Sequence, residues 1–235
     1  MIKRIVHTLG RKYIDKIIRS EADNQQFTHH NERPVEFGFS LRVIAESEPK
    51  PKTVCDVGTG TTAFPHLLRN CGLIVTALDN VRDYWPEGMQ NRHWHVLDVD
   101  VTTLNGFGNR QFDAITCISV LEHIKDQQRA MANMVSMLKP GGLLIMTTPF
   151  STHNACENVY LRDDALYGKD LPYPCRSHSQ REMDGWKSLG LNLQRSEYWR
   201  MFSGPVWATG QRVPWVKVED VNETHQLGCF SFTRL

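Results

Sequence analysis

Apolar side chains recur along this chain first at helical spacing and then in short runs that alternate with further helical stretches. Residues 1–20 and 35–47 show the helical period, the first with basic residues set among the apolar ones. Strands alternating with helices predict an α/β fold, with a parallel sheet covered by helices on both faces. The predicted strands lie at residues 53–57, 73–78, 95–99, 112–118, 143–147, 191–199 and 228–235, and the helices between them at 63–70, 127–138 and 179–190.

The turn after the first predicted strand is the clearest candidate for a binding site. The stretch Thr53–Thr62 reads TVCDVGTGTT, and Gly58 and Gly60 lack a Cβ atom, so a ligand can lie close to the backbone there. The helix that follows begins at Ala63 with Pro65 in its first turn, where proline is tolerated. A strand, a glycine turn and a helix N-terminus together predict a nucleotide site.

Two kinds of nucleotide ligand fit this turn, and Asp56 helps to separate them. Gly58, Gly60 and Ala63 satisfy the G-x-G-x-x-A pattern of dinucleotide-binding proteins. A carboxylate at Asp56 would repel a pyrophosphate, but it suits a ligand that carries an ammonium group. Asp79 ends the second predicted strand, where an acid accepts hydrogen bonds from the ribose hydroxyls of either ligand. An NAD(P)-dependent oxidoreductase therefore stays open as an alternative.

Composition narrows the class of protein. With 235 residues, 40% of them apolar, the chain can bury a full core, and a net charge of +1 supplies no general attraction for nucleic acid. Six cysteines without a C-x-x-C pair predict reduced thiols in a cytoplasmic protein, not disulfides or a zinc site. Neither a signal peptide nor an apolar run of membrane-spanning length is visible. Glu122 and His123 are too few to predict a metal site.

Three motifs make the chain resemble the class I S-adenosylmethionine-dependent methyltransferases, of the small-molecule kind similar to methyltransferase types 11 and 12. The first is D-x-G-x-G at residues 56–60, with Thr62 where the family usually has a third glycine. The second is FDAITCISVLEHI at 112–124, and the third is LKPGGLLIMTTP at 138–149. The resemblance covers about residues 53–149 and favours methyltransferase over NAD(P) binding.

The resemblance implies a Rossmann-like three-layer sandwich around a seven-stranded, mostly parallel sheet whose last strand is antiparallel. It also implies S-adenosyl-L-methionine as the cofactor. An acid after the third strand would meet the adenine amino group, and Asp100 fits that position better than Asp98. The positions predicted to bind the cofactor are Asp56, Gly58, Thr59, Gly60, Asp79, Asn80, Asp100, Val101, Ile118 and Ser119.

Methyl transfer from a sulfonium needs mainly a well-placed nucleophile, and a base only where the acceptor loses a proton of high pKa. His123 follows the fourth strand and is predicted as that base; the alternative is a histidine bonded to backbone. We expect the acceptor to be a small polar metabolite or a glycan precursor, methylated on O or N, and not a nucleic acid. Residues predicted to contact it are His153, Tyr160, Arg162, Arg176 and His178.

The domain organisation predicted is an N-terminal helical cap at residues 1–50 and a methyltransferase domain at 51–235. Substrate-binding insertions are expected at about 150–178 and 200–227, because these segments lack clear periodicity. The basic helix at 1–20 fits an anionic membrane or a partner protein, but we favour its packing on the core of the domain. A non-catalytic relative that acts through this helix is a further alternative for the whole chain.

Overall fold

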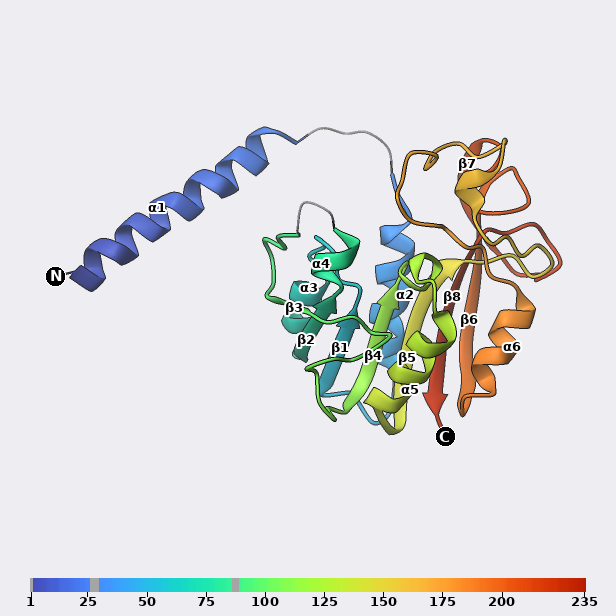
Figure 1. Ribbon diagram of the computed structural model, residues 1–235, viewed down its shortest axis with the longest axis horizontal. Coiled ribbons are helices and arrows are strands. Elements are labelled where there is room, and N and C mark those ends of the chain that lie inside the picture. The colour runs from blue at the N-terminus through green and yellow to red at the C-terminus, as the bar shows by residue number, and fades with distance from the viewer. Residues whose placement is uncertain (1, 26–29, 86–88) are drawn as a thin grey trace. The chain divides into compact units, whose positions relative to one another are not determined.

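The chain folds into two units, residues 1–32 and 33–235 (Figure 1). The computed structural model describes residues 2–25, 30–85 and 89–235. The first unit contains α1 (Ile2–Asp23), which confirms a helix over residues 1–20. Sequence reasoning placed α2 (Arg33–Glu46) in the same cap, but the structure groups it with the sheet, because Phe39 and Val43 are buried in the core beneath it. None of the described helices is long and apolar enough to span a membrane.

The described strands form one sheet in the second unit, in the order β3-β2-β1-β4-β5-β8-β6-β7. The pairs from β3 to β5 are parallel, and β8 runs antiparallel to both β5 and β6, as the resemblance implied. The strands are β1 (Thr53–Val57), β2 (Ile74–Asp79), β3 (Val96–Asp98), β4 (Phe112–Ile118), β5 (Leu138–Pro149), β6 (Leu191–Phe202), β7 (Arg212–Val218) and β8 (Leu227–Arg234).

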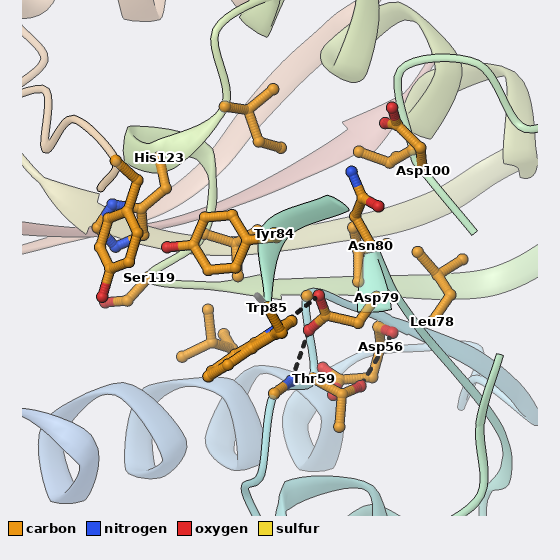
Figure 2. Close-up of a pocket in the computed structure, with 18 of the residues that line it drawn as sticks. Asp56, Thr59, Leu78, Asp79, Asn80, Tyr84, Trp85, Asp100, Ser119 and His123 are labelled. Atoms are coloured by element: carbon orange, nitrogen blue, oxygen red, sulfur yellow. Dashed lines mark hydrogen bonds between the residues drawn. The ribbon is translucent and has the colours of Figure 1, made fainter. Parts of the chain in front are cut away.

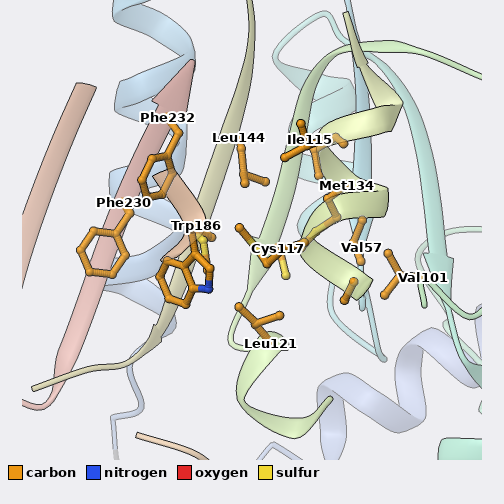
Figure 3. Close-up of a cluster of buried hydrophobic side chains, with 14 of the residues drawn as sticks. Val57, Val101, Ile115, Cys117, Leu121, Met134, Leu144, Trp186, Phe230 and Phe232 are labelled. Atoms are coloured by element: carbon orange, nitrogen blue, oxygen red, sulfur yellow. The ribbon is translucent and has the colours of Figure 1, made fainter. Parts of the chain in front are cut away.

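Helices cover both faces of the sheet, which makes the three predicted layers. The strands alternate their side chains between the faces, so Val54 packs in the core with α2 and α3, whereas Cys55 and Val57 pack in the core with α5 and α6 (Figure 3). The remaining helical segments are α3 (Phe64–Asn70), α4 (Val81–Tyr84), α5 (Gln127–Met137), α6 (Gln180–Lys187) and the 3₁₀ turns η1 (Leu121–His123) and η2 (Val159–Leu161).

The prediction of seven strands was wrong by one, since eight strands are present in the described part of the chain. The additional strand is β7, which lies inside the segment 200–227 and pairs antiparallel with β6. Pro214 lies within this strand, although proline has no N–H to donate to a ladder. β7 is an edge strand, where one side makes no ladder bonds, and a proline is tolerated in that position.

Candidate functional site

A cavity of about 730 Å³ lies where β1, β2 and β4 end (Figure 2). The carboxyl ends of parallel strands meet at one edge of a sheet, so the short segments that follow each strand converge there. Every residue predicted to bind the cofactor or to act as a base lines the cavity, namely Asp56, Gly58, Thr59, Gly60, Asp79, Asn80, Asp100, Val101, Ile118, Ser119 and His123.

The glycine turn forms one wall of the cavity with its bare backbone. Gly58 and Gly60 have φ angles of 72° and 56°, in the left-handed region that side chains disfavour. A Cβ atom at Gly58 would overlap the side chain of Val120, and the Gly58 backbone N–H donates to the Leu78 carbonyl at 2.8 Å. Local conformation and close packing therefore both require glycine at this point.

Asp56 is a buried carboxylate at the base of the cavity, with 3% of its surface exposed. The Thr116 hydroxyl donates to its Oδ1 at 2.7 Å, and the Thr59 hydroxyl donates to its Oδ2 at 2.7 Å. Burial raises the pKa of Asp56 to about 6, although both hydroxyls act in the opposite direction. Asp56 is therefore mostly ionised at neutral pH and offers a negative charge to a cationic group.

Asp79 ties the glycine turn to the end of β2. Its Oδ2 accepts from the Gly60 backbone N–H at 2.7 Å, and its Oδ1 accepts from the indole Nε1–H of Trp85 at 3.3 Å (Figure 2). Burial raises the pKa of this carboxyl. Sequence reasoning missed Trp85, which lines the cavity, although an aromatic pair directly after the second strand was a visible signal.

The two acids near the end of β3 lie in different places. Asp98 accepts from the backbone N–H of Val81 at 3.0 Å and pairs with the Arg82 guanidinium at 2.6 Å, and it is not among the residues that line the cavity. Asp100 lines the cavity, and its Oδ1 accepts from the backbone N–H and the hydroxyl of Thr102 at 2.7 and 2.8 Å. Position in the structure thus agrees with the preference for Asp100.

His123 lies on the cavity wall in η1, next to two tyrosines that stack on each other. Its Nδ1 is 2.7 Å from the Pro174 carbonyl oxygen, which can only accept, so Nδ1 carries the proton and Nε2 keeps a lone pair. Burial lowers the pKa of His123, which makes the ring neutral at pH 7. The ring meets Tyr173 edge to face at 4.9 Å, and Tyr173 stacks on Tyr84 at 4.7 Å.

Glu122 lies beneath His123, with 3% of its surface exposed. Burial raises its pKa to about 8, and the Thr148 hydroxyl lies 3.3 Å from its Oε2. Its Oε1 is 3.9 Å from Nε2 of His123, a separation compatible with an ion pair. Because the pKa of His123 is lowered and that of Glu122 is raised, both groups are neutral at pH 7 and no ion pair forms.

A further buried acid, Glu36 of α2, bonds to residues of the cavity wall. Its Oε1 accepts from the hydroxyls of Ser119 and Thr147, the latter at 2.7 Å, and its Oε2 pairs with Arg33 at 2.7 Å. Ser119 has a φ of 50°, in the left-handed region that non-glycine residues rarely adopt. Both Ser119 and Arg33 line the cavity, so Glu36 contacts two residues of its wall. Sequence reasoning missed Glu36, because a glutamate in a helix of mixed pattern reads as solvent-facing.

The residues predicted to contact the acceptor lie elsewhere, and none is among those lining the cavity. His178 is fully buried, with ring nitrogens bonded to Thr148 at 2.9 Å and to Gln127 at 3.1 Å. Arg176 donates to the same Gln127 oxygen at 2.8 Å and pairs with Glu157. The bridge between residues 150 and 178 turns His178 toward the core, away from the cavity.

The other three predicted acceptor residues also have partners of their own. Tyr160 is buried in the core on the α2 face, and Arg162 pairs with Asp164 at 2.7 Å. The His153 ring lies 3.4 Å from the Asn222 side chain. Acceptor binding by these side chains stays a prediction. From the same insertion, the structure instead brings Pro172, Tyr173 and Pro174 to the cavity.

Among the described residues, no group of three or more His, Cys, Asp or Glu side chains is arranged to hold a metal ion. All six cysteines are free thiols, four of them buried. The residues lining the cavity include carboxylates, a neutral histidine, a guanidinium, an ammonium group at Lys125, hydroxyls and aromatic rings.

Comparison with known proteins finds methyltransferases among the matches. The model of a methyltransferase domain family matches residues 28–202. Ubiquinone biosynthesis O-methyltransferase of Coxiella burnetii is 33% identical over 119 residues, 48% of each chain. The enzyme of the same name from Xanthomonas axonopodis pv. citri is 32% identical over 137 residues, 54% of each chain. The chain thus matches these curated relatives over only about half of their length.

Solved structures agree on the fold. The 1,6-didemethyltoxoflavin-N1-methyltransferase of Burkholderia thailandensis, solved with S-adenosylhomocysteine, has a TM-score of 0.57 at 15% identity, covering 97% of this chain and 89% of that one. A methyltransferase from Thermotoga maritima has a TM-score of 0.56 at 17% identity, covering 95% and 97%. At such identities the likeness shows a shared fold.

Proposed function

Because the chain belongs to the class I S-adenosylmethionine-dependent methyltransferase family, we propose that it methylates a hydroxyl oxygen of a small molecule, with His123 as the proton acceptor. The observation that carries this proposal is the position of His123 on the cavity wall with its Nδ1 bonded to the Pro174 carbonyl, which makes Nε2 the ring nitrogen able to accept a proton. Family membership removes the reason to retain an NAD(P)-dependent oxidoreductase.

The residues of the cavity fit S-adenosylmethionine. Asp56 supplies a negative charge for an ammonium group, and Arg33 supplies a positive charge for a carboxylate. Asp79 holds a carboxylate for ribose hydroxyls, and Asp100 holds one for the adenine amino group. When bound, the cofactor supplies a methyl group already activated by a sulfonium. The protein then has to bind and orient the acceptor and remove its proton.

A hydroxyl acceptor makes a base useful, because a neutral hydroxyl is a weak nucleophile. The Pro174 carbonyl holds the His123 ring in the tautomer whose Nε2 accepts a proton. The lowered pKa keeps that nitrogen unprotonated at pH 7. Glu122 is mostly protonated at pH 7, so it does not hold His123 in the charged form. The His123 ring therefore stays neutral until its Nε2 takes the proton of the acceptor.

The rings beside His123 support an acceptor that is itself a ring. Tyr84 and Tyr173 present a stacked pair of aromatic side chains, with Pro172 and Pro174 next to them along the cavity. Aromatic faces bind planar rings by stacking and sugar rings by their C–H groups. A small polar metabolite with a hydroxylated ring, or a glycan precursor, therefore suits the wall. The two relatives named above are O-methyltransferases of ubiquinone biosynthesis, which supports oxygen as the acceptor atom.

The test is a methyl-transfer assay with S-adenosylmethionine and a panel of phenols and sugars, read by mass spectrometry of the product. His123→Gln should lower kcat by about 10²-fold or more, while the Kd for S-adenosylhomocysteine changes little. His95→Gln is the matched control, since this histidine is exposed and does not line the cavity. An unchanged kcat in His123→Gln, or a methyl group found on nitrogen, would contradict the proposal. Cofactor binding without transfer to any acceptor would favour the non-catalytic alternative.

A further inference from the structure

The helix α1 leaves a broad apolar face exposed. Val6, Leu9, Tyr13 and Ile17 follow one another at intervals of three and four residues and so lie on one side of the helix. Other apolar residues extend this face on both flanks. The side chains that are more than half exposed are those of Ile5, Val6, Leu9, Tyr13, Ile14 and Ile18. The helix therefore has a large apolar surface that is exposed within its own unit.

Positive charge is concentrated on the same helix. Residues 2–20 contain six Lys or Arg residues and a single acid, Asp15. The whole chain has 27 basic and 26 acidic residues, which leaves 21 basic against 25 acidic residues outside this stretch. Arg4 and Arg11 lie on the side opposite Leu9, Lys12 borders the apolar face beside Ile5, and Lys3 and Lys16 lie within that face. The surface that α1 offers is thus complementary to a negatively charged, apolar partner.

We propose that α1 binds the surface of an anionic lipid bilayer and lies in its interfacial plane. Its apolar residues spread over more than half of the helix circumference, which is broader than the narrow seam by which a helix enters a protein groove. A bilayer accepts such a face without a complementary shape. The lysines within and beside this face can extend their ammonium groups to the lipid headgroups while their methylene stems stay in contact with the apolar layer.

The experiment is flotation of the full chain with vesicles of phosphatidylcholine alone, or of phosphatidylcholine and phosphatidylglycerol in equal parts. We expect binding to the anionic vesicles, weakened by added salt, because each Lys or Arg near such a surface contributes about fivefold to partitioning. Leu9→Gln should lower this binding by about tenfold or more, since it removes an isobutyl group that the bilayer would bury. Thr8→Gln is the matched control, adjacent in sequence but on the polar side.

Three results would overturn the proposal. The first is an absence of binding by the parent chain to anionic vesicles, and the second is equal binding by Leu9→Gln and Thr8→Gln. The third is equal binding to both vesicle types, which would leave no role for charge. A lower melting temperature of Leu9→Gln together with no vesicle binding would instead place α1 on the core of its own protein. Both variants should keep the affinity of the parent for S-adenosylhomocysteine, which verifies that residues 33–235 stay folded.

Discussion

Thr116→Val tests the role of Asp56 through its protonation. Asp56 and Thr116 are direct neighbours on the parallel strands β1 and β4, and the Thr116 hydroxyl donates to Asp56 at 2.7 Å. Valine keeps the shape of threonine and removes this donor. A hydrogen bond to an ionised group is worth about 1.5–3 kcal/mol, so its loss should move the ionisation of Asp56 upward by about one to two pH units.

The effect on cofactor affinity follows from the ionised fraction of Asp56. With a pKa of about 6, the parent is about nine tenths ionised at pH 7. In the variant this fraction falls to between about one half and one tenth, so a cationic ligand should bind about two- to tenfold more weakly. The sign is fixed by charge: affinity recovers as pH rises, because the carboxylate ionises again in the variant.

Calorimetric titration with S-adenosylmethionine between pH 6 and about 9 measures this effect. The ratio of the two Kd values at each pH cancels the titration of the ligand itself. Thr209→Val is the control for a lost buried hydroxyl, because the Thr209 hydroxyl bonds to Val206 within its own turn and Thr209 does not line the cavity. A Kd ratio that is the same at every pH would refute the reasoning, as would equal affinity at pH 7.

Two further predictions concern the other buried carboxyls. Asp79→Asn should raise the Kd for S-adenosylhomocysteine by about tenfold or more in calorimetry, because Gly60 N–H and the ligand lose a charged acceptor; an unchanged Kd would remove the ribose assignment. Unfolded Glu122 ionises near pH 4.5, whereas the folded protein keeps the proton up to about 8, so rising pH in this window favours unfolding. The Glu122→Gln variant lacks this titration. Its free energy of unfolding should therefore rise relative to that of the parent by up to about 1.4 kcal/mol per pH unit in urea titrations between about pH 5 and 8. A difference between variant and parent that stays constant with pH would contradict the raised pKa of Glu122.

Much of the fold followed from local pattern. Apolar runs of strand length between helical stretches predicted the strands from β1 to β6 and β8, within a few residues of their observed bounds. The pattern failed at β7, where Pro214 and a half-exposed edge hide the strand. In the insertion at 150–178, the pattern of polar and aromatic residues did not separate side chains on the cavity wall from side chains packed in the core. Packing turned His178 inward and left Tyr173 on the cavity wall.

The sequence by itself determined the glycine turn, the acids at the strand ends and hence the family, because these features depend on neighbouring residues and on the end of each strand. Tertiary structure alone decided which groups support the site. Ser119 and Glu36 meet across 83 residues, and His123 meets Pro174 across 51. Burial then sets the charge of Asp56, Glu122 and His123. Burial depends on residues that are distant in sequence but packed around the side chain, so it cannot be predicted from a local pattern.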